Sequence, residues 1–539
     1  MSTTPLDLAA LTSGRDMWST AELPGIRSIL MADGPMGIAS GRVDERDVAV
    51  LTPCGTALGA SFDAELVARV GAIVGMEARR LGVDAVLAPN LNLQRSPLCG
   101  RAFELYGEDP YLAGHLGAAW ISGLQGQGVG SVAKHLVCND SETDRDSMNA
   151  VASDRALREC YLLPFEMAAA AGCIGMLAAY NRLNGDYCVE HRQLLTDIVK
   201  GDWGFTGFIV SDWFGGRDTL RSAQAGLDLD MPGPDRVLGT KFAAAVRDGQ
   251  VPLERLADAT SRVANAVARI DALPRQSPIA DPDATLVEAA AGFVLLKNKG
   301  EVLPVLSSRV RRIAIIGPNA ASPCLQGGTF AKIAVRPDFV TPLQAIRDRF
   351  GDKCEILYEQ GVEPEYRLPP ISATPARDLG DGATRGLTVE WLPAAGDVPV
   401  HAETRDTNSL TWFVGLPGTD ALKQPGRIRA TGWVTPEWTG PHRLHVGGTG
   451  AVTLSVDGEQ VFAGGGPVSP SDLMGVLKGG DSQSVVVDLK AGQPVLLRFE
   501  LTYSPPAPRA CGTGCGGRTC PTPCWPAPLP PRPRPILSC

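Results

Sequence analysis

The stretch Gly207–Trp213, with the sequence GFIVSDW, decides the fold of the first half of this chain. Its apolar run, 208–210, is followed at once by a serine, Asp212 and Trp213. A short continuous hydrophobic segment with polar residues at its carboxyl end is typical of a buried parallel strand. In α/β barrels that end of each strand carries the chemistry. Asp212 is therefore our first candidate for a catalytic residue.

Other apolar runs in the first half of the chain end in the same way. They stop at polar residues, namely Asp33, Asn90, Asn92, Lys134, His135, Tyr180, Asn181, Asp228 and Asp230. Segments with helical periodicity separate the runs, such as 63–81, which stops at Gly82, and 153–172, which starts at Ser153 and is kinked by Pro164. The alternation predicts right-handed βαβ units and an α/β barrel or wound sheet. The polar side chains would then meet at the mouth formed by the carboxyl ends of the strands.

Any one of these residues has a commoner role than catalysis. A single Asp or Asn after a strand usually caps a helix or forms a turn. For Lys134 and His135, an ion pair in a barrel rim is an equal alternative. The joint pattern favours a sugar site, because charged groups grip hydroxyls and an aromatic face stacks on the C–H surface of a sugar ring.

Size and charge narrow the classes of protein. At 539 residues, the chain is long enough for two or more domains. Its net charge of −9 argues against nucleic acid or an anionic membrane as the partner, so a small neutral or polar molecule fits better. The first residues lack the features of a signal peptide and no long apolar run occurs, which predicts a cytoplasmic location. The oligomeric state stays open.

Six quoted motifs, taken together, carry a family resemblance. They are DGPMG (33–37), RSPLCGRAFELYGEDPYL (95–112), KHLVCNDSETDR (134–145), AAYNRLNG (178–185), WGFTGFIVSDW (203–213) and AGLDLDMPGP (225–234). In this order and spacing they resemble the β-glucosidases of glycoside hydrolase family three, specifically the subgroup with an inserted PA14-type domain. The resemblance covers the chain from its first residue to about residue 504.

The resemblance implies a role for each matching residue. Asp212 is expected to be the nucleophile that forms a covalent glycosyl-enzyme. The residues expected to bind the sugar are Asp33, Arg101, Lys134 and His135, with Tyr180 beside the nucleophile and Trp213 in the pocket wall. Arg101 and Lys134 would favour the ionised form of Asp212. Glu142 and Arg145 are interpreted as outer supports and Asp230 as structural, and neither a metal nor a cofactor is implied.

The same resemblance divides the chain into domains. A TIM-type (β/α) barrel is expected over 1–272, a linker over 273–285, and a partial α/β sandwich domain over 286–385. In that second domain, 292–305 is predicted to be a helix that runs into a strand within 311–320, and the loop GGTFA, 327–331, is expected to approach the sugar pocket. From 386 to 504, alternating strands with turn signals, including the Asp-Gly pair in VDGEQ, predict an all-β, PA14-like sandwich.

The last part of the chain, 505–539, has a different composition. It contains no acidic residue, many prolines and arginines, and five of the thirteen cysteines. We interpret it as a disordered tail and as coding sequence read out of frame. A zinc site at Cys511, Cys515, Cys520 and Cys524 is the alternative, although their spacing is unlike that of zinc ribbons. The other eight cysteines are scattered singly, which suits reduced core thiols.

The expected function is that of an exo-acting retaining β-glucosidase, which hydrolyses terminal non-reducing β-D-glucosyl residues. In the family, the acid/base glutamate follows the PA14 insertion, so the resemblance predicts a C-terminally truncated chain without it and with impaired turnover. A non-catalytic sugar-binding remnant and a β-xylosidase stay open as alternatives. The β-N-acetylglucosaminidase branch is disfavoured, because LVCND follows His135 in place of that branch's own histidine loop. The glycosidic linkage and the aglycone stay open as well.

Overall fold

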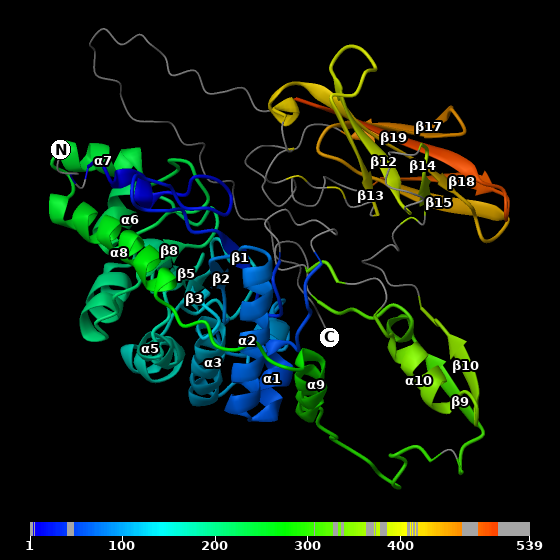
Figure 1. Cartoon of the computed structure of the whole chain (residues 1–539), viewed down its shortest axis with the longest axis horizontal. Helices are drawn as coiled ribbons and strands as arrows, with labels where there is room; N and C mark the ends of the chain where they lie inside the picture. Colours follow the sequence, from blue (N-terminus) through cyan, green and yellow to red (C-terminus); the bar gives the residue numbers. More distant parts are fainter. Residues whose placement is uncertain are drawn as a thin grey trace, which may run out of the picture.

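The computed structural model describes most of the chain. The described residues are 4, 6–39, 48–306, 308–326, 333–335, 339–362, 371, 373–377, 385–406, 410, 412, 416, 419–465 and 483–504. The loop 327–331 and the tail 505–539, for which predictions were made above, lie outside them. Figure 1 shows an α/β region in the first half of the chain and a β-rich region in the second half. In the part of the chain described, no helix is long and apolar enough to cross a membrane.

A parallel sheet forms the centre of the α/β region. Its strands are β1 (Met31–Asp33), β2 (Ala85–Leu87), β3 (Gly130–Leu136), β5 (Gly175–Ala178) and β8 (Phe208–Ser211), hydrogen-bonded in that order. All neighbouring pairs run parallel. These strands confirm the apolar runs read from the sequence. The sixth run, at 227–231, forms a single parallel bridge from Leu229 to Val210 of β8, and the next residue, Asp230, bridges to Ser13.

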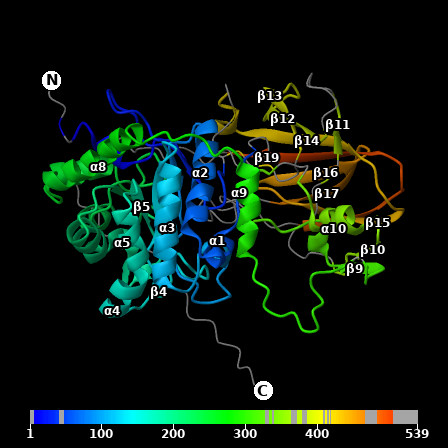
Figure 2. The same cartoon turned by 60° about the horizontal axis from the view of Figure 1, so that its bottom comes forward.

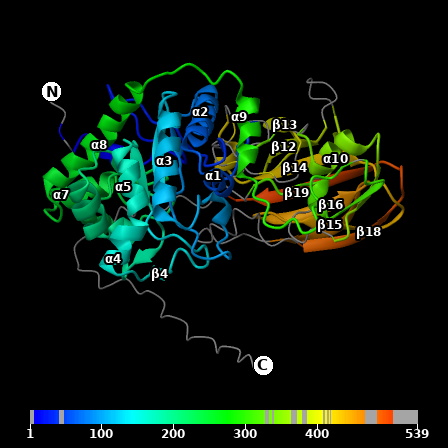
Figure 3. The same ribbon diagram turned by 90° about the horizontal axis from the view of Figure 1, so that it is seen from below.

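Helices pack against both faces of this sheet, most of them against one. They are α1 (Gly55–Ser61), α2 (Ala64–Arg80), α3 (Pro110–Gln125), α5 (Leu163–Ala170), α6 (Thr219–Ala225), α7 (Thr240–Arg247) and α8 (Leu253–Asp271). Figures 2 and 3 show α5, α3 and α2 side by side. The α2 prediction is confirmed, because Asp63 caps its start by accepting a hydrogen bond from the Leu66 N–H, and Gly82 follows it with a φ of +71°.

The segment predicted as one kinked helix over 153–172 is divided. Ser153 caps α4 (Asp154–Ala156), which continues as a π-helical turn, Leu157–Tyr161, before α5 begins. Pro164 lies in the first turn of α5, where its missing N–H is tolerated. The start at Ser153 is therefore confirmed, whereas the kink predicted at Pro164 is a division of the segment just before the proline.

Both faces of the sheet are buried, as a parallel sheet requires. Side chains of Val86, Ala133 and Ile209 belong to the core that the sheet shares with α2 and α3. Alternate residues, such as Leu87 and Val210, belong to a second core on the opposite face. Polar residues that directly follow a strand are therefore held by two packed layers.

The segment after α9 (Pro282–Glu288) contains a small parallel pair, β9 (Arg312–Ile316) and β10 (Glu355–Glu359), with α10 (Pro342–Phe350) between them in sequence. The helix predicted within 292–305 is wrong. A 3-10 turn ends at Gly292, and the following residues form no regular structure, with Phe293 88% and Leu296 92% exposed. Most helical stability comes from burying an apolar face, and these side chains have none to pack on among the described residues.

The β-rich region contains two antiparallel sheets. Its strands are β11 (Ala373–Pro375), β12 (Leu387–Pro393), β13 (His401–Arg405), β14 (Gly426–Val434), β15 (Gly440–Val446), β16 (Ala451–Val456), β17 (Glu459–Gly465), β18 (Gln483–Leu489) and β19 (Val495–Tyr503). The larger sheet has the order β13-β12-β14-β19-β16-β17, with β11 on β14, and β15 pairs with β18. A shared core of apolar side chains, including Trp391 and Val446, joins the sheets. The predicted Asp-Gly hairpin is confirmed, since Asp457 and Gly458 both have positive φ between β16 and β17.

Candidate active site

Asp212 directly follows β8 and is only 8% exposed. Its carboxylate accepts a hydrogen bond from the Trp213 N–H at 2.7 Å and lies 3.8 Å from Nε2 of His135. Burial raises the pKa of Asp212 to about 6, although the charges of Arg145, Arg101 and Lys134 act in the opposite direction. The expected effect of Arg101 and Lys134 is therefore present, but burial outweighs it.

Lys134 and Asp33 are brought together from two strands. Lys134 lies in β3 and is almost fully buried, and its Nζ forms an ion pair with Oδ1 of Asp33 at the end of β1. The same Asp33 oxygen accepts a hydrogen bond from the Gly34 N–H at 2.9 Å. This pairing places both side chains at the carboxyl end of the parallel sheet, as the strand-end pattern predicted.

Arg101 connects the next two members of the site. Its guanidinium donates to both carboxylate oxygens of Glu104, at 3.1 and 2.6 Å, and Nη1 lies 2.8 Å from Nε2 of His135. Burial alone would lower the pKa of Arg101, but the ion pair with Glu104 outweighs it and the pKa lies above its usual range. Sequence reasoning missed Glu104, although its position three residues after Arg101 in the same motif is a usable signal.

His135 is held as a neutral side chain. Burial first, and then the positive charges of Arg101 and Lys134, lower its pKa well below the usual range. Since an arginine N–H can only donate, Nε2 accepts from Arg101, and the ring proton lies on Nδ1, 3.2 Å from the Asn92 Oδ1. The Asn92 amide also donates to the His135 carbonyl at 2.9 Å, which fixes the backbone at this point.

Arg145 acts on Asp212 more directly than the sequence suggested, and it packs on Tyr180. The guanidinium carbon of Arg145 lies 4.6 Å from the centre of the Tyr180 ring, and its Nη1 pairs with Glu142 at 2.7 Å. Burial, and next the neighbouring Asp212, raise the pKa of the Tyr180 phenol. Arg145 is also the strongest charge that opposes the raised pKa of Asp212. It acts directly on the candidate nucleophile, whereas Glu142 supports Arg145.

Trp213 is buried beside the site. Its indole N–H donates to the Met17 carbonyl at 2.6 Å, and its ring centre lies 5.4 Å from that of Trp18 at an interplanar angle of 38°. The Tyr180 hydroxyl donates to the Trp213 carbonyl at 2.7 Å. Sequence reasoning missed Trp18, which carries no strand-end signal. A place for Trp213 in the wall of a sugar pocket stays a prediction.

The two aspartates of the last run do not join Asp212. Asp230 is fully buried and accepts hydrogen bonds from the Val237 N–H at 2.9 Å and the Ser211 hydroxyl at 3.3 Å. Asp228 lies toward the other end of β8, where its Oδ2 accepts from the Ile209 N–H at 2.9 Å. The prediction that Asp228 shares the mouth of the sheet is therefore wrong.

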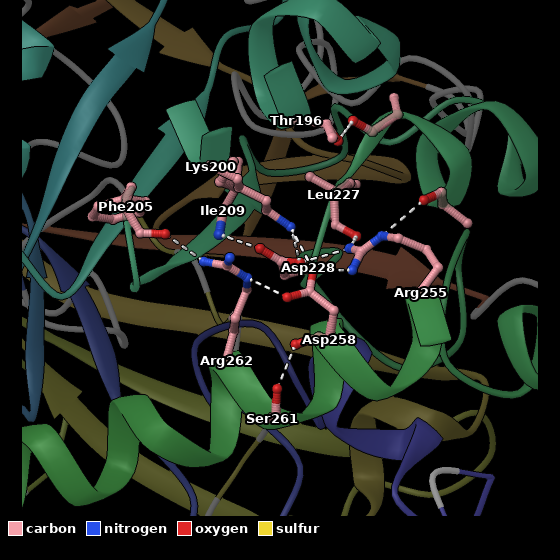
Figure 4. Close-up of polar contacts among 12 residues, drawn as sticks. Thr196, Lys200, Phe205, Ile209, Leu227, Asp228, Arg255, Asp258, Ser261 and Arg262 are labelled. Atoms are coloured by element: carbon pink, nitrogen blue, oxygen red, sulfur yellow. Dashed lines mark hydrogen bonds and ion pairs between the residues drawn. The ribbon is translucent and has the colours of Figure 1, made fainter. Parts of the chain in front are cut away.

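Asp228 belongs to a buried ionic cluster. Its Oδ1 accepts from Lys200 Nζ and Arg255 Nη2, both at 2.6 Å. Figure 4 shows Arg255, Asp258 and Arg262 of α8 pointing toward Asp228. Arg262 donates to the carbonyls of Phe205 and Gly207 at 2.6 and 2.9 Å, just before β8 begins. The cluster thus ties α8 to the amino end of the strand that carries Asp212.

Three other carboxylates of the strand-end motifs already have a positive partner. Asp33 pairs with Lys134, Glu104 with Arg101, and Glu142 with Arg145. Among the described residues, no group of three His, Cys, Asp or Glu side chains could hold a metal ion. The described part of the site therefore combines a buried carboxylate that has no Lys or Arg ion pair, Asp212, with a shell of donors. Such an arrangement suits attack on an electrophilic carbon between hydroxyl-binding groups.

Comparison with known proteins places this chain in a class of carbohydrate-active proteins. The profile described as Glycosyl hydrolase family 3 N terminal domain matches residues 7–266, and the profile described as Glycosyl hydrolase family 3 C-terminal domain matches 293–462. The chain belongs to glycosyl hydrolase family 3. The family part of the predicted resemblance is thereby confirmed.

Individual relatives are longer than this chain. A Beta-glucosidase of Rhizobium radiobacter is 38% identical over 469 residues, which are 84% of this chain and 56% of the relative. The Probable beta-glucosidase K of Emericella nidulans is 34% identical over 93% of this chain and 60% of its own length. The crystal structure of Beta-glucosidase from Kluyveromyces marxianus in complex with glucose matches with a TM-score of 0.81 and 27% identity, over 93% of this chain and 62% of that one. The chain thus spans between half and two thirds of these relatives' lengths.

Proposed function

We propose that this chain acts on β-glucosides as an exo-acting retaining glycosidase, with Asp212 as the nucleophile. The observation that carries the proposal is the position of Asp212, a buried carboxylate directly after β8 and within reach of His135, Arg145 and Tyr180. The names of the relatives support the substrate class. The glucose bound in the Kluyveromyces marxianus enzyme supports a small sugar ligand for the same fold.

The proposed reaction begins with attack by one oxygen of ionised Asp212 on the anomeric carbon. The bond from that carbon to the aglycone oxygen breaks, and a covalent glycosyl-enzyme remains. Neutral His135 and positively charged Arg101 and Lys134 offer acceptors and donors for sugar hydroxyls. Because Nε2 of His135 accepts from Arg101, it does not protonate the aspartate. Arg145 favours the ionised nucleophile.

A general acid for the leaving group is not assigned among the described residues, since Asp33, Glu104 and Glu142 are each in an ion pair. We therefore propose that these 539 residues turn over ordinary glucosides weakly. General acid–base assistance typically contributes about 10²–10⁴ in rate. Glycosides whose leaving group needs no proton are the exception.

The proposal includes the architecture expected above. A TIM-type barrel over 1–272 is supported by the parallel strand order and by the bridges that connect β8 to 229 and then 230 to 13. A PA14-like insertion over 386–504 is supported by the two antiparallel sheets with a common core. The profile of the second family domain extends to residue 462, into these sheets, as an insertion within that domain would produce.

Covalent labelling tests the function. The reagent is a 2-deoxy-2-fluoro-β-glucoside with a dinitrophenolate leaving group, which departs without a proton. We expect a stable adduct of one fluoroglucosyl unit, found by peptide mass spectrometry on Asp212. Asp212→Asn should abolish it, with a loss in labelling rate of at least about 10³-fold.

Asp202→Asn is the matched control, since this exposed aspartate pairs with Arg158 and precedes β8, whereas Asp212 follows it. It should label like the parent chain. An adduct on another carboxylate would contradict the assignment of Asp212, and no adduct in a folded chain would favour a sugar-binding protein without turnover. Faster labelling by the corresponding xylosyl reagent would point to a β-xylosidase.

A further inference from the structure

An exposed aromatic platform lies in the β-rich region, in the loop between β14 and β15. The Trp438 side chain is 57% exposed, although it is the largest apolar side chain that a protein carries. Its ring stacks on the imidazole of His442, with 4.4 Å between ring centres and an interplanar angle of 10°. Since the imidazole covers one face of the indole, the exposed area belongs to the opposite face and the edges.

Hydrogen bonds hold the His442 ring and the loop that carries Trp438. His442 lies in β15, and its Nδ1 is 3.0 Å from the Gly440 carbonyl. The loop is tied to the turn between β18 and β19, because the Gly492 N–H donates to the Pro436 carbonyl at 2.9 Å. The Ala491 N–H also donates to the Thr439 hydroxyl oxygen at 3.0 Å. A side chain held in this way loses little entropy when a ligand covers it.

Packing explains one face of Trp438 but not the other. His442 shares the inward side of β15 with Leu444, which packs on both cores of the β-rich region. One face of the indole therefore rests on an imidazole of the inward side of β15. Leaving the second face in water has a hydrophobic cost that a smaller residue would avoid. The free face is thus available to a ligand.

We propose that the Trp438–His442 platform of the β-rich region binds a glucopyranose unit of a β-linked gluco-oligosaccharide. One side of such a ring presents axial C–H groups, which pack on the face of an indole, and its edge carries hydroxyls that need polar partners. Glu437 and Thr439, the neighbours of Trp438 in sequence, are both exposed and polar. Exposed Lys490 directly precedes Ala491, whose N–H donates to the Thr439 hydroxyl oxygen. An apolar face with a polar rim matches the two sides of the sugar.

The surroundings favour a sugar over a protein partner. A stable protein interface buries about 800 Å² on each side, and its centre is depleted of Lys and Glu. Trp438 is instead flanked by Glu437 and Thr439, both exposed, and faces no wider apolar patch in its own loop. A single rigid aromatic face of this kind is sized for one sugar ring.

The inference goes beyond the proposed function and does not depend on turnover. It is tested with the full chain after fluoroglucosyl labelling, which fills the candidate active site, or in the Asp212→Asn background, where the oligosaccharide stays intact and the signal is the part of the binding that Trp438→Ala removes. Cellotetraose and laminaritetraose are titrated by isothermal calorimetry. We expect saturable binding that Trp438→Ala weakens at least about tenfold, because an aromatic stacking contact of this size is lost.

Trp433→Ala is the matched control. Trp433 lies at the end of β14 and is 41% exposed, but it has no aromatic stacking partner among the described residues. This variant should bind like the parent chain, and Trp438→Phe should retain part of the affinity. His442→Ala should weaken binding while the thermal unfolding midpoint of the larger sheet stays the same.

Two results would overturn the proposal. One is equal affinity of the Trp438→Ala variant and the parent chain for both oligosaccharides. The other is an equal loss in the Trp433→Ala variant, which would indicate a general effect of exposed tryptophans. If Trp438→Ala unfolds, the indole N–H resonance of Trp438 in the parent chain decides, because it must shift on addition of the oligosaccharide. An unchanged resonance would contradict the site.

Discussion

The two ends of β8 carry aspartates in opposite situations. At the amino end, the carboxylate of Asp228 takes two cations, Lys200 and Arg255, at 2.6 Å each, and the Ile209 N–H at 2.9 Å (Figure 4). At the carboxyl end, Asp212 accepts the Trp213 N–H, and the nearest basic nitrogen paired with it is the neutral His135 at 3.8 Å. Both side chains are buried, yet Asp228 is closely paired and Asp212 is not.

The difference separates stability from chemistry. A buried carboxylate with two close cations has its charge neutralised and fixes the strand in place. A buried carboxylate whose cations stay farther away keeps a raised pKa, here about 6, and its charge remains available to react. Strand β8 is thus held by the ion pairs of Asp228 at its amino end, whereas Asp212 at its carboxyl end has no close cation among the described residues.

Replacement of Asp228, at the amino end of β8, should have the largest effect on the free energy of unfolding. Asp228→Asn keeps the size of the side chain but leaves Lys200 and Arg255 without their shared carboxylate. Breaking a buried ion pair by removing one partner costs about 3–5 kcal/mol. We expect that loss in the free energy of unfolding of the α/β region, measured by urea denaturation. Asp202→Asn, which removes an ion pair whose side chains are half exposed, should cost at most about 1 kcal/mol.

If Asp228→Asn were as mild as Asp202→Asn, the cluster in Figure 4 would not anchor β8. A double variant, Asp228→Asn with Lys200→Met, should recover part of the lost stability. Burial already lowers the pKa of Lys200, although Asp228 favours its charge, so without that carboxylate the ammonium becomes the costly group.

Replacement of Asp212, at the carboxyl end of β8, should raise the free energy of unfolding instead of lowering it. Folding raises the pKa of Asp212 from about 3.9 in an unfolded chain to about 6, so the folded state loses stability as the pH rises through that interval. Asp212→Asn removes the cost, and at pH 7 the variant should be more stable than the parent by about 2–3 kcal/mol. Below about pH 4 the gain should vanish, because Asp212 is then protonated in both states. A destabilised variant at pH 7 would contradict this account.

The smallest effect concerns Arg145, the strongest charge that favours ionised Asp212. Arg145→Met removes that charge and should raise the pKa of Asp212 further, by about one unit. The measurement is the pH at which the labelling rate reaches half its maximum, which should move upward by the same amount. Arg158→Met, in the exposed pair with Asp202, should leave this midpoint unchanged. A downward shift would assign Arg145 a different role.

Local sequence patterns predicted the elements that hold this site. Apolar runs with polar ends became β1, β2, β3, β5 and β8, and parallel pairing then brought Asp33, Lys134 and Asp212 to one end of the sheet. Those predictions succeeded because burial on both faces of a parallel sheet leaves a clear signal in the sequence.

Contacts that depend on the path of loops were not predictable in the same way. The pairing of Arg101 with Glu104 also involves Asn90, whose amide donates to Glu104 at 3.1 Å from the strand side. The placement of Asp228 depends on register, since the N–H groups of both Asp228 and Leu229 donate to the Ile209 carbonyl. A shift of one residue would turn Asp228 to the other side. The helix predicted within 292–305 failed because periodicity alone does not supply a surface to pack on.

The pH dependence of covalent labelling tests the central claim most directly. The rate of fluoroglucosyl transfer to Asp212 from the dinitrophenyl reagent depends on the ionised nucleophile and not on an acid. The account predicts a rate that rises about tenfold per pH unit at low pH and levels off with a midpoint near 6. A midpoint at or below about 4, the ordinary value for an aspartate, would contradict it.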